Sequence, residues 1–447
     1  MMQKIMKSFL PMLILPCIVP KIQEAISSYS IVKIFCRLFL SIFLFLMLQV
    51  DRTCLANFDL ELYMSGLSNN LLMSQEEINN FNKKINNTVS LSSFKSTLSK
   101  EELEKLIFQN NYYFPLYIDS IYYEHQNFDN KIVVKDQNII KYAITLKRVN
   151  IRTFPTLERA SYSPNDSRFD QFQETTFEIN EPVLVITEDK SGKWAFIQGR
   201  DYNGWTLKKD IAFFHNKEEF IKYIKSLKSN FITTISSKSR LMFDTGEFQD
   251  INMGTKFIIK EKEPINGFLR VIVPIKDSFG MIKFTTGSIS TSDVVYKFLP
   301  YTRKNVIIQA FKMLNEPYGW GGENGFHDCS SFIQDIFKTF GFTFPRNADA
   351  QEMLPGTRFS FKNLDYDERL QLIKNLKPIS LLFMKDHVML YLGFIDNSPY
   401  VINDITAYYQ NGILVRDYKV AVTDIINARR SDSKSFLESL TTAIEIP

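Results

Sequence analysis

The sequence predicts a multidomain protein of the α+β class. Its 447 residues exceed the size of a typical single domain, and 45% hydrophobic with 23% charged residues is an ordinary globular composition. From about residue 141 to 300, short apolar stretches alternate with turn residues, as in all-β domains. After residue 301, helical spacing and strand alternation follow one another, which indicates a mixed domain. The net charge of +4 is too small to suggest a nucleic-acid partner.

Residues 1–56 have the composition of an export signal. Basic residues Lys33 and Arg37 precede an apolar run that ends at Leu48, and Cys54-Leu-Ala56 offers a cleavage site after Ala56. The alternative is an uncleaved membrane anchor. Either way we expect an exported protein of the periplasm or cell envelope. Three of the four cysteines, Cys17, Cys36 and Cys54, lie in this segment, so cleavage would leave Cys329 as the single thiol.

Residues 57–140 are polar and have helical patterns without chemical motifs. Ser74 with Glu77, and Ser99 with Glu102, each have the spacing of a capping box at a helix start. We therefore expect a small helical N-terminal domain in this part of the chain.

Two all-β segments follow, at residues 141–214 and 229–300. Short strands, frequent aromatic residues and the pair Gly204-Trp205 make the first segment similar to a bacterial SH3-like β-barrel, with Trp194 and Trp205 in its core. The second segment resembles a more divergent barrel of the same kind. Residues 215–228 between them read as a charged linker with helical spacing, and His215 and His125 as surface residues.

Residues 301–430 combine the features of a catalytic domain. A helix is expected from Arg303 to Leu314, and a second helix follows the glycine-rich loop at 319–325. Cys329 falls in the first turn of the second helix. There the helix dipole and unpaired N–H groups favour a thiolate nucleophile.

A cysteine nucleophile needs a base, and His387 is the best placed of the four histidines. It opens a strand whose alternation puts His387, Met389 and Tyr391 on one face. Asn403, in the next strand, is expected to hydrogen-bond the imidazole and fix its tautomer. A one-residue change of register would place Asp404 on that face instead. His327 is too close to Cys329 in sequence to act as the base, and we expect it in a loop at the rim.

Four motifs in this region resemble those of the NlpC/p60 family of cell-wall cysteine peptidases. They are Pro317-Tyr-Gly-Trp-Gly-Gly322, Asp328-Cys-Ser-Ser331, Phe344-Pro-Arg-Asn347 with Gln351, and His387-Val-Met-Leu-Tyr-Leu-Gly393. The resemblance implies a papain-like fold with Cys329 as nucleophile, His387 as base and Asn403 as the orienting residue. Many relatives carry histidine in place of Asn403 and glycine in place of Asp386. We expect Asp386 to raise the basicity of His387.

The resemblance also implies a substrate and a binding site. Relatives with the Asp-Cys-Ser motif hold the free amine of the first alanine of a stem peptide, which would assign substrate binding to Tyr318, Asp328 and Ser330. From residue type and place alone, Asp328 is equally a helix N-cap. The loop at 156–173 is expected to close one side of the site. No metal ion or organic cofactor is implied.

The predicted function is therefore a peptidoglycan hydrolase, a γ-D-glutamyl-diamino acid endopeptidase acting on stem peptides through a thioester. Two alternatives remain at this stage. One is a non-catalytic wall-binding protein whose SH3-like domains do the work, and the other is an amidase or acyltransferase on the same fold.

Overall fold

The computed structural model describes residues 60–447, apart from 87, 109–115, 120, 124–131, 165 and 167. The chain divides into two units, residues 1–65 and 66–447. In the first unit residues 60–64 are helical. The expected export signal, the three N-terminal cysteines and His125 lie outside the described residues. Within the described part, no helix is long and apolar enough to cross a membrane.

The N-terminal part of the second unit mixes short helices and short strands. The helices α4 (Gln75–Asn82) and α5 (Lys100–Ile107) begin with the two predicted capping boxes. Between and after them, β1 (Thr97–Ser99) pairs with β4 (Gln137–Ile139), and β2 (Leu116–Ile118) with β3 (Ile121–Tyr123). The described residues therefore do not form the purely helical segment that we predicted. Strands of three residues are too short for alternation to reveal them.

The first large sheet is antiparallel and has seven strands in the order β12-β5-β9-β10-β11-β6-β8. Trp194 and Trp205 are buried in its core, as predicted. The strands are β5 (Lys141–Thr145), β6 (Val149–Arg152), β8 (Gln173–Phe177), β9 (Pro182–Glu188), β10 (Trp194–Gln198), β11 (Asn203–Leu207) and β12 (Ile211–Phe213). The short strand β7 (Ala160–Ser161) pairs with β2 instead.

A helix leads from the first sheet to the second. It is α6 (Lys217–Ser229), whose apolar face packs into the core of the first sheet through Phe220, Tyr223 and Leu227. His215, just before it, is exposed and pairs with Glu219. The second sheet has the order β15-β14-β18-β17-β16-β13-β19. Its strands are β13 (Phe231–Thr234), β14 (Lys238–Phe243), β15 (Phe248–Asn252), β16 (Lys256–Ile259), β17 (Phe268–Lys276), β18 (Ile282–Ser290) and β19 (Val294–Tyr296).

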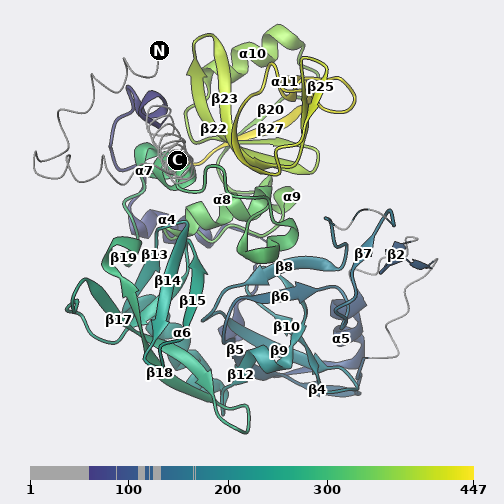
Figure 1. The fold of residues 1–447 in the computed structure, drawn as a ribbon, viewed down its shortest axis with the longest axis vertical. Helices are drawn as coiled ribbons and strands as arrows, with labels where there is room; N and C mark the ends of the chain where they lie inside the picture. The colour runs from purple at the N-terminus through teal and green to yellow at the C-terminus, as the bar shows by residue number, and fades with distance from the viewer. Residues whose placement is uncertain are drawn as a thin grey trace, which may run out of the picture. The chain divides into compact units, whose positions relative to one another are not determined.

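The C-terminal part is an α+β domain built on one antiparallel sheet in the order β20-β27-β21-β22-β23-β26 (Figure 1). The sheet strands are β20 (Thr357–Ser360), β21 (Leu381–Met384), β22 (His387–Ile395), β23 (Ser398–Ile405), β26 (Lys419–Asp424) and β27 (Leu440–Glu445), and a separate hairpin joins β24 (Tyr408–Gln410) to β25 (Ile413–Val415). The helices are α7 (Arg303–Phe311), α8 (Cys329–Lys338), α9 (Ala348–Gln351), α10 (Tyr366–Asn375) and α11 (Phe436–Ser439).

The boundary that we predicted at residue 430 is too early. The strand β27 lies between β20 and β21, with its residues Ala443 and Ile444 fully buried, so the tail is an interior part of the sheet. The sequence after Asp432 carries no motif, and only its pairing partners, far away along the chain, reveal its place.

The helix α8 packs on the face of this sheet formed by β22 and β23 (Figure 1). Its residues Phe332, Ile333, Ile336 and Phe337 are fully buried, which is the apolar face that helical spacing predicted. Burial of four large apolar side chains anchors the helix, so its N-terminus has a fixed position beside the sheet.

Candidate active site

The nucleophile candidate is the first residue of α8. Asp328 is the N-cap: its Oδ1 accepts the N–H of Ser331 at 3.0 Å, while Oγ of Ser331 accepts the N–H of Asp328 at 2.9 Å. This reciprocal capping box fixes where the helix begins. Cys329 is partly exposed. With Asp328 and Ser331 satisfied by the capping box, the N–H groups of Cys329 and Ser330 are the ones of the first turn that remain available to an anion beside Cys329.

The loop before α8 depends on glycine. In η7 (Trp320–Gly325), Gly321 and Gly322 have φ of +55° and +81°, which disfavour any residue with a Cβ. A Cβ on Gly321 would also come within 2.9 Å of the carbonyl oxygen of Gln173 in β8. Because glycine leaves this space free, the backbone of Gly321 can approach Gln173, whose Nε2 donates to the carbonyl of Gly321 at 3.0 Å. The first sheet therefore lies directly against the loop that leads to Cys329.

His387 and Asn403 are in contact. They occupy the starting end of β22 and the finishing end of β23, neighbouring antiparallel strands. Nε2 of His387 and Oδ1 of Asn403 are 2.8 Å apart. An amide oxygen can only accept a hydrogen bond, so Nε2 carries the proton. The neutral imidazole consequently has its lone pair on Nδ1, the nitrogen left for a thiol.

The orientation of the Asn403 amide is fixed by β26. Its Nδ2 donates to the carbonyl of Ala421 at 3.2 Å and to Oγ1 of Thr423 at 3.0 Å. Both partners are acceptors in this arrangement, so a rotated amide would turn its oxygen toward a carbonyl. Asn403 is fully buried. These contacts favour the predicted register over the alternative in which Asp404 faces the imidazole.

Cys329 is adjacent to the histidine strand, because the backbone N–H of Val388 hydrogen-bonds its sulfur. Burial and the Asp328 carboxylate nevertheless raise the pKa of Cys329 to about 12. Burial lowers the pKa of His387 to about 4, although the hydrogen bond to Asn403 acts in the opposite direction. Both shifts favour a neutral thiol and a neutral imidazole in the resting pair. Their directions are opposite to the preformed thiolate and to the increased basicity of His387 that we expected.

Asp386 has a backbone role. It has φ of +63° in the two-residue turn between β21 and β22. Glycine adopts this conformation without a steric penalty, and aspartate tolerates it better than most residues. The turn therefore requires a residue before His387 that tolerates a positive φ.

The Asp328 carboxylate is already paired. Nη2 of Arg346 lies 2.5 Å from its Oδ2, and Nη1 of Arg346 donates to Oγ of Ser330 at 2.8 Å. Nε of Arg346 donates to Oγ1 of Thr175 in the first sheet at 2.6 Å. All of these residues are buried. We expected Asp328 and Ser330 to bind a substrate amine. In the ligand-free structure, Asp328 caps the helix, and both residues contact Arg346. The motif that contains Arg346 was evident in the sequence, but the ion pair between Arg346 and Asp328 was not.

Tyr318 lies where the first sheet meets the C-terminal domain. Its ring makes an edge contact with Phe169, at 6.4 Å between centroids. Phe169 belongs to the loop at 156–173 and also contacts Trp320 at 5.3 Å and Tyr418 at 6.4 Å. The indole Nε1 of Trp320 donates to the carbonyl of Asp170 at 2.9 Å. The loop expected to border the site is thus in contact with Tyr318.

His327 is not at the rim, as expected, but buried. Its Nε2 is 3.0 Å from Oδ2 of Asp335, and its Nδ1 is 3.6 Å from Oε2 of Glu316. Burial alone would lower the pKa of His327, but these two carboxylates raise it above its usual value. Asn252 of the second sheet approaches the same Nε2 at 3.5 Å and donates to the carbonyl of Gly325 at 3.1 Å. Asp335 and Glu316 are near His327 in sequence, but their convergence on the imidazole, like the approach of Asn252, depends on the tertiary fold.

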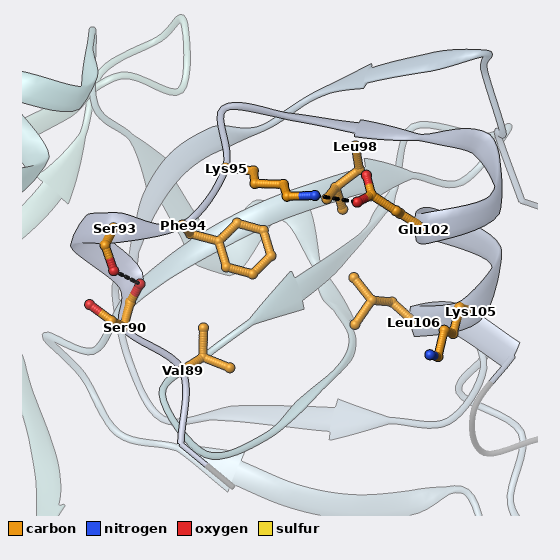
Figure 2. Close-up of a pocket in the computed structure, with 9 residues that line it drawn as sticks. All are labelled: Val89, Ser90, Ser93, Phe94, Lys95, Leu98, Glu102, Lys105 and Leu106. Atoms are coloured by element: carbon orange, nitrogen blue, oxygen red, sulfur yellow. Dashed lines mark hydrogen bonds and ion pairs between the residues drawn. The ribbon is translucent and has the colours of Figure 1, made fainter. Parts of the chain in front are cut away.

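Two features elsewhere bear on what the protein binds. A pocket of about 450 Å³ lies in the N-terminal part, where Lys95 and Glu102 pair across it (Figure 2). Its lining contains neither a thiol nor an imidazole: Val89, Ser90, Ser93, Phe94, Lys95, Leu98, Glu102, Lys105 and Leu106. In the part of the chain that the structure describes, no three His, Cys, Asp or Glu side chains are arranged to hold a metal ion.

Comparison with known families assigns two regions of the chain. Residues 155–206 match the SH3 domain of the SH3b1 type, and residues 315–424 match the NlpC/P60 family. The first match covers much of the first sheet, and the second covers the segment that contains Cys329, His387 and Asn403. That the second sheet is another SH3-like barrel stays a prediction.

Two individual proteins are similar to this chain. The γ-D-glutamyl-L-lysine dipeptidyl-peptidase of Bacillus subtilis (strain 168) is 25% identical over 210 residues, which are 44% of this chain and 63% of that protein. The chain thus spans less than two thirds of that relative. The solved structure of an NlpC/P60 endopeptidase from Photobacterium damselae subsp. piscicida has a TM-score of 0.64 at 17% identity. The matched region covers 84% of this chain and 94% of the Photobacterium chain. This similarity shows the fold.

Proposed function

We propose that the chain is an NlpC/P60 peptidase with an SH3-type domain, and that it hydrolyses peptidoglycan stem peptides between the D-glutamyl residue and the diamino acid. The observation that carries the proposal is the 2.8 Å contact between His387 and Asn403, next to a cysteine at a helix start. The name of the Bacillus relative supports the γ-D-glutamyl linkage.

The proposed reaction begins from the neutral pair. Nδ1 of His387 takes the thiol proton as Sγ of Cys329 attacks the carbonyl carbon of the γ-D-glutamyl amide. The oxyanion that forms is stabilised by N–H groups at the start of α8. The intermediate collapses to a thioester, and the leaving amine of the diamino acid takes the proton from His387. His387 then deprotonates a water molecule that attacks the thioester, and it returns this proton to the departing Sγ of Cys329, which restores the neutral pair.

Asn403 supports both proton transfers. By accepting from Nε2 it keeps the lone pair on Nδ1, and it stabilises the imidazolium that exists while the proton is held. Its own anchors on Ala421 and Thr423 keep the amide from rotating.

The substrate is proposed to carry a free amine. A stem peptide released from the glycan has an ammonium on its first alanine, and Tyr318, Asp328 and Ser330 are the residues proposed to surround it. A glycan-linked peptide has no such charge and brings a bulky sugar to a place bordered by Phe169 of the loop at 156–173. Such substrates occur outside the cytoplasm, so we also propose that the protein is exported to the periplasm or cell envelope.

Mass spectrometry of purified stem peptides tests this function. We expect the wild-type protein to release the dipeptide that ends in D-glutamate, and Cys329→Ala to release none while keeping the wild-type Tm. Cleavage at another bond, or transfer to an added amine, would favour the amidase or acyltransferase alternative. Binding to the wall without any cleavage would favour the wall-binding alternative.

A further inference from the structure

Asp404 is a buried carboxyl group without a partner. It follows Asn403 in β23, so its side chain points to the opposite face of the strand. It is fully buried, and neither of its carboxyl oxygens has a hydrogen-bond partner. An unpaired buried carboxyl group destabilises a fold, because it loses its hydration without compensation. Such a group is retained most readily where function requires it.

The neighbours of Asp404 place it beside the nucleophile. Across the sheet it pairs with Val420 in β26, whose N–H donates to the carbonyl of Glu316 at 2.9 Å. After burial and Asp328, Asp404 also contributes to the raised pKa values of Cys329 and Tyr318. Asp404 therefore lies close to the residues that are proposed to surround the substrate's amine.

Asp404 differs from the two carboxylates near it. Asp328 is paired with Arg346, and Oε2 of Glu316 lies 3.6 Å from Nδ1 of His327 without a hydrogen bond. Asp404 has no hydrogen-bond partner and no ion pair among the described residues. Burial, with Asp328 and Glu316 nearby, raises the pKa of Asp404 well above its usual range. The described residues offer no three-ligand arrangement for a metal ion, so an organic ammonium fits the site better.

We propose that Asp404 is the specificity-determining residue that pairs with the substrate's ammonium group. The inference rests on the proposed function, because that function supplies a peptide with a free amine. Both oxygens of Asp404 are closed off from solvent in the ligand-free protein, so the incoming amine must displace part of their cover. An ammonium beside Asp404 favours the carboxylate form, so a proton that the group holds in the ligand-free protein goes to the solvent.

Asp404→Asn tests the proposal because it keeps the shape and removes the charge. Turnover is measured on the tripeptide L-alanyl-γ-D-glutamyl-diamino acid and on its N-acetylated form. The control is Asp396→Asn, an exposed residue at the β22–β23 turn, where asparagine tolerates the φ of +47°. Melting temperature and the rate of Cys329 alkylation check that the variant is folded with an intact nucleophile.

We expect wild type and Asp396→Asn to prefer the free peptide. Asp404→Asn should lose about 10- to 100-fold in kcat/KM on the free peptide, the value of one charged hydrogen bond, and change little on the acetylated one. Its Tm should be no lower than that of wild type. Calorimetry with Cys329→Ala in two buffers should show more proton release per free peptide bound than the same experiment with Asp404→Asn added.

Other results would overturn the inference. An unchanged preference in Asp404→Asn, or an equal loss on both peptides, would make Asp404 a structural residue behind Cys329. Equal wild-type rates on both peptides would show that no ammonium is recognised. In each of these cases the proposed cleavage reaction stands, although equal wild-type rates also remove the free amine from the proposed substrate. A wild-type protein that cleaves neither peptide overturns the proposed function as a whole.

Discussion

At the scale of single residues, the site depends on how His387 and Asn403 orient each other. The sequence was sufficient to predict this pair, because strand alternation and the family resemblance both pointed to it. It was not sufficient for the protonation states. Burial sets the pKa values of Cys329 and His387, and burial depends on the helix and strands that cover them. The unpaired state of Asp404 was hidden for the same reason.

Asn403→Ala should lower kcat by roughly 10- to 100-fold and change KM little, because a charge-assisted hydrogen bond to the imidazolium is lost. Thr423→Val should have a smaller effect in the same direction, since the amide keeps its bond to Ala421. Asn375→Ala, an exposed residue of α10, is the control. Steady-state kinetics on the stem tripeptide would contradict the role of Asn403 if Asn403→Ala matched this control.

The acid limb of kcat/KM should lie well below pH 6.5. His387 acts as a base only when neutral, and its lowered pKa of about 4 leaves it neutral above that value, so activity should persist at pH 5. Asn403→Ala should move the limb to still lower pH, because the hydrogen bond that raises the His387 pKa is gone. A wild-type limb at or above pH 6.5 would show that the imidazole is better solvated than the structure indicates.

At the scale of elements, the start of α8 is held by partners from three separate segments. The capping box is local, and the sequence pattern alone predicts it. Arg346, which pairs with Asp328, follows the end of the helix by several residues, and Thr175 comes from the first sheet. Contacts of this kind are set by tertiary packing. The motif that contains Arg346 was therefore visible in the sequence, but its pairing with Asp328 was not.

Arg346→Met should destabilise the protein by about 3–5 kcal/mol, because it leaves the Asp328 carboxylate buried without its partner. The double variant Arg346→Met/Asp328→Asn should recover much of this loss, since no unpaired charge remains. Denaturant unfolding of the two variants and of wild type measures both effects. Equal stabilities of the single and double variants would mean that Arg346 contributes by packing instead of by charge.

At the scale of the whole second unit, the segment that matches the NlpC/P60 family was predicted from its motifs, and the segment that matches the SH3 domain from its short strands and aromatic residues. Three features were not predicted: the interior strand β27, the buried His327 and the mixed character of the N-terminal part. The place of β27 and the pairing of β1 with β4 depend on segments that are remote in sequence, whereas the N-terminal strands were missed because they are short. Phe169, in the loop at 156–173, contacts Tyr318 and Trp320, so this loop borders the proposed site.

Phe169→Ala should lower kcat/KM by about 3- to 10-fold, because aromatic pairs contribute roughly 0.5–1.5 kcal/mol each and the border of the site becomes looser. The selectivity against glycan-linked peptides should fall at the same time. Phe279→Ala is the control, since Phe279 is 88% exposed in a turn of the second sheet. Kinetics on free and glycan-linked peptides would contradict the role of Phe169 if the two variants behaved alike.

The central claim is that Cys329 forms a thioester with the γ-D-glutamyl carbonyl. Acid quenching during turnover, followed by intact-protein and peptide mass spectrometry, tests it directly. We predict an added mass equal to the alanyl-D-glutamyl acyl group, located on the peptide that contains Cys329 and absent from Cys329→Ala. Hydrolysis by folded Cys329→Ala at the wild-type rate, or an adduct on another residue, would contradict the claim.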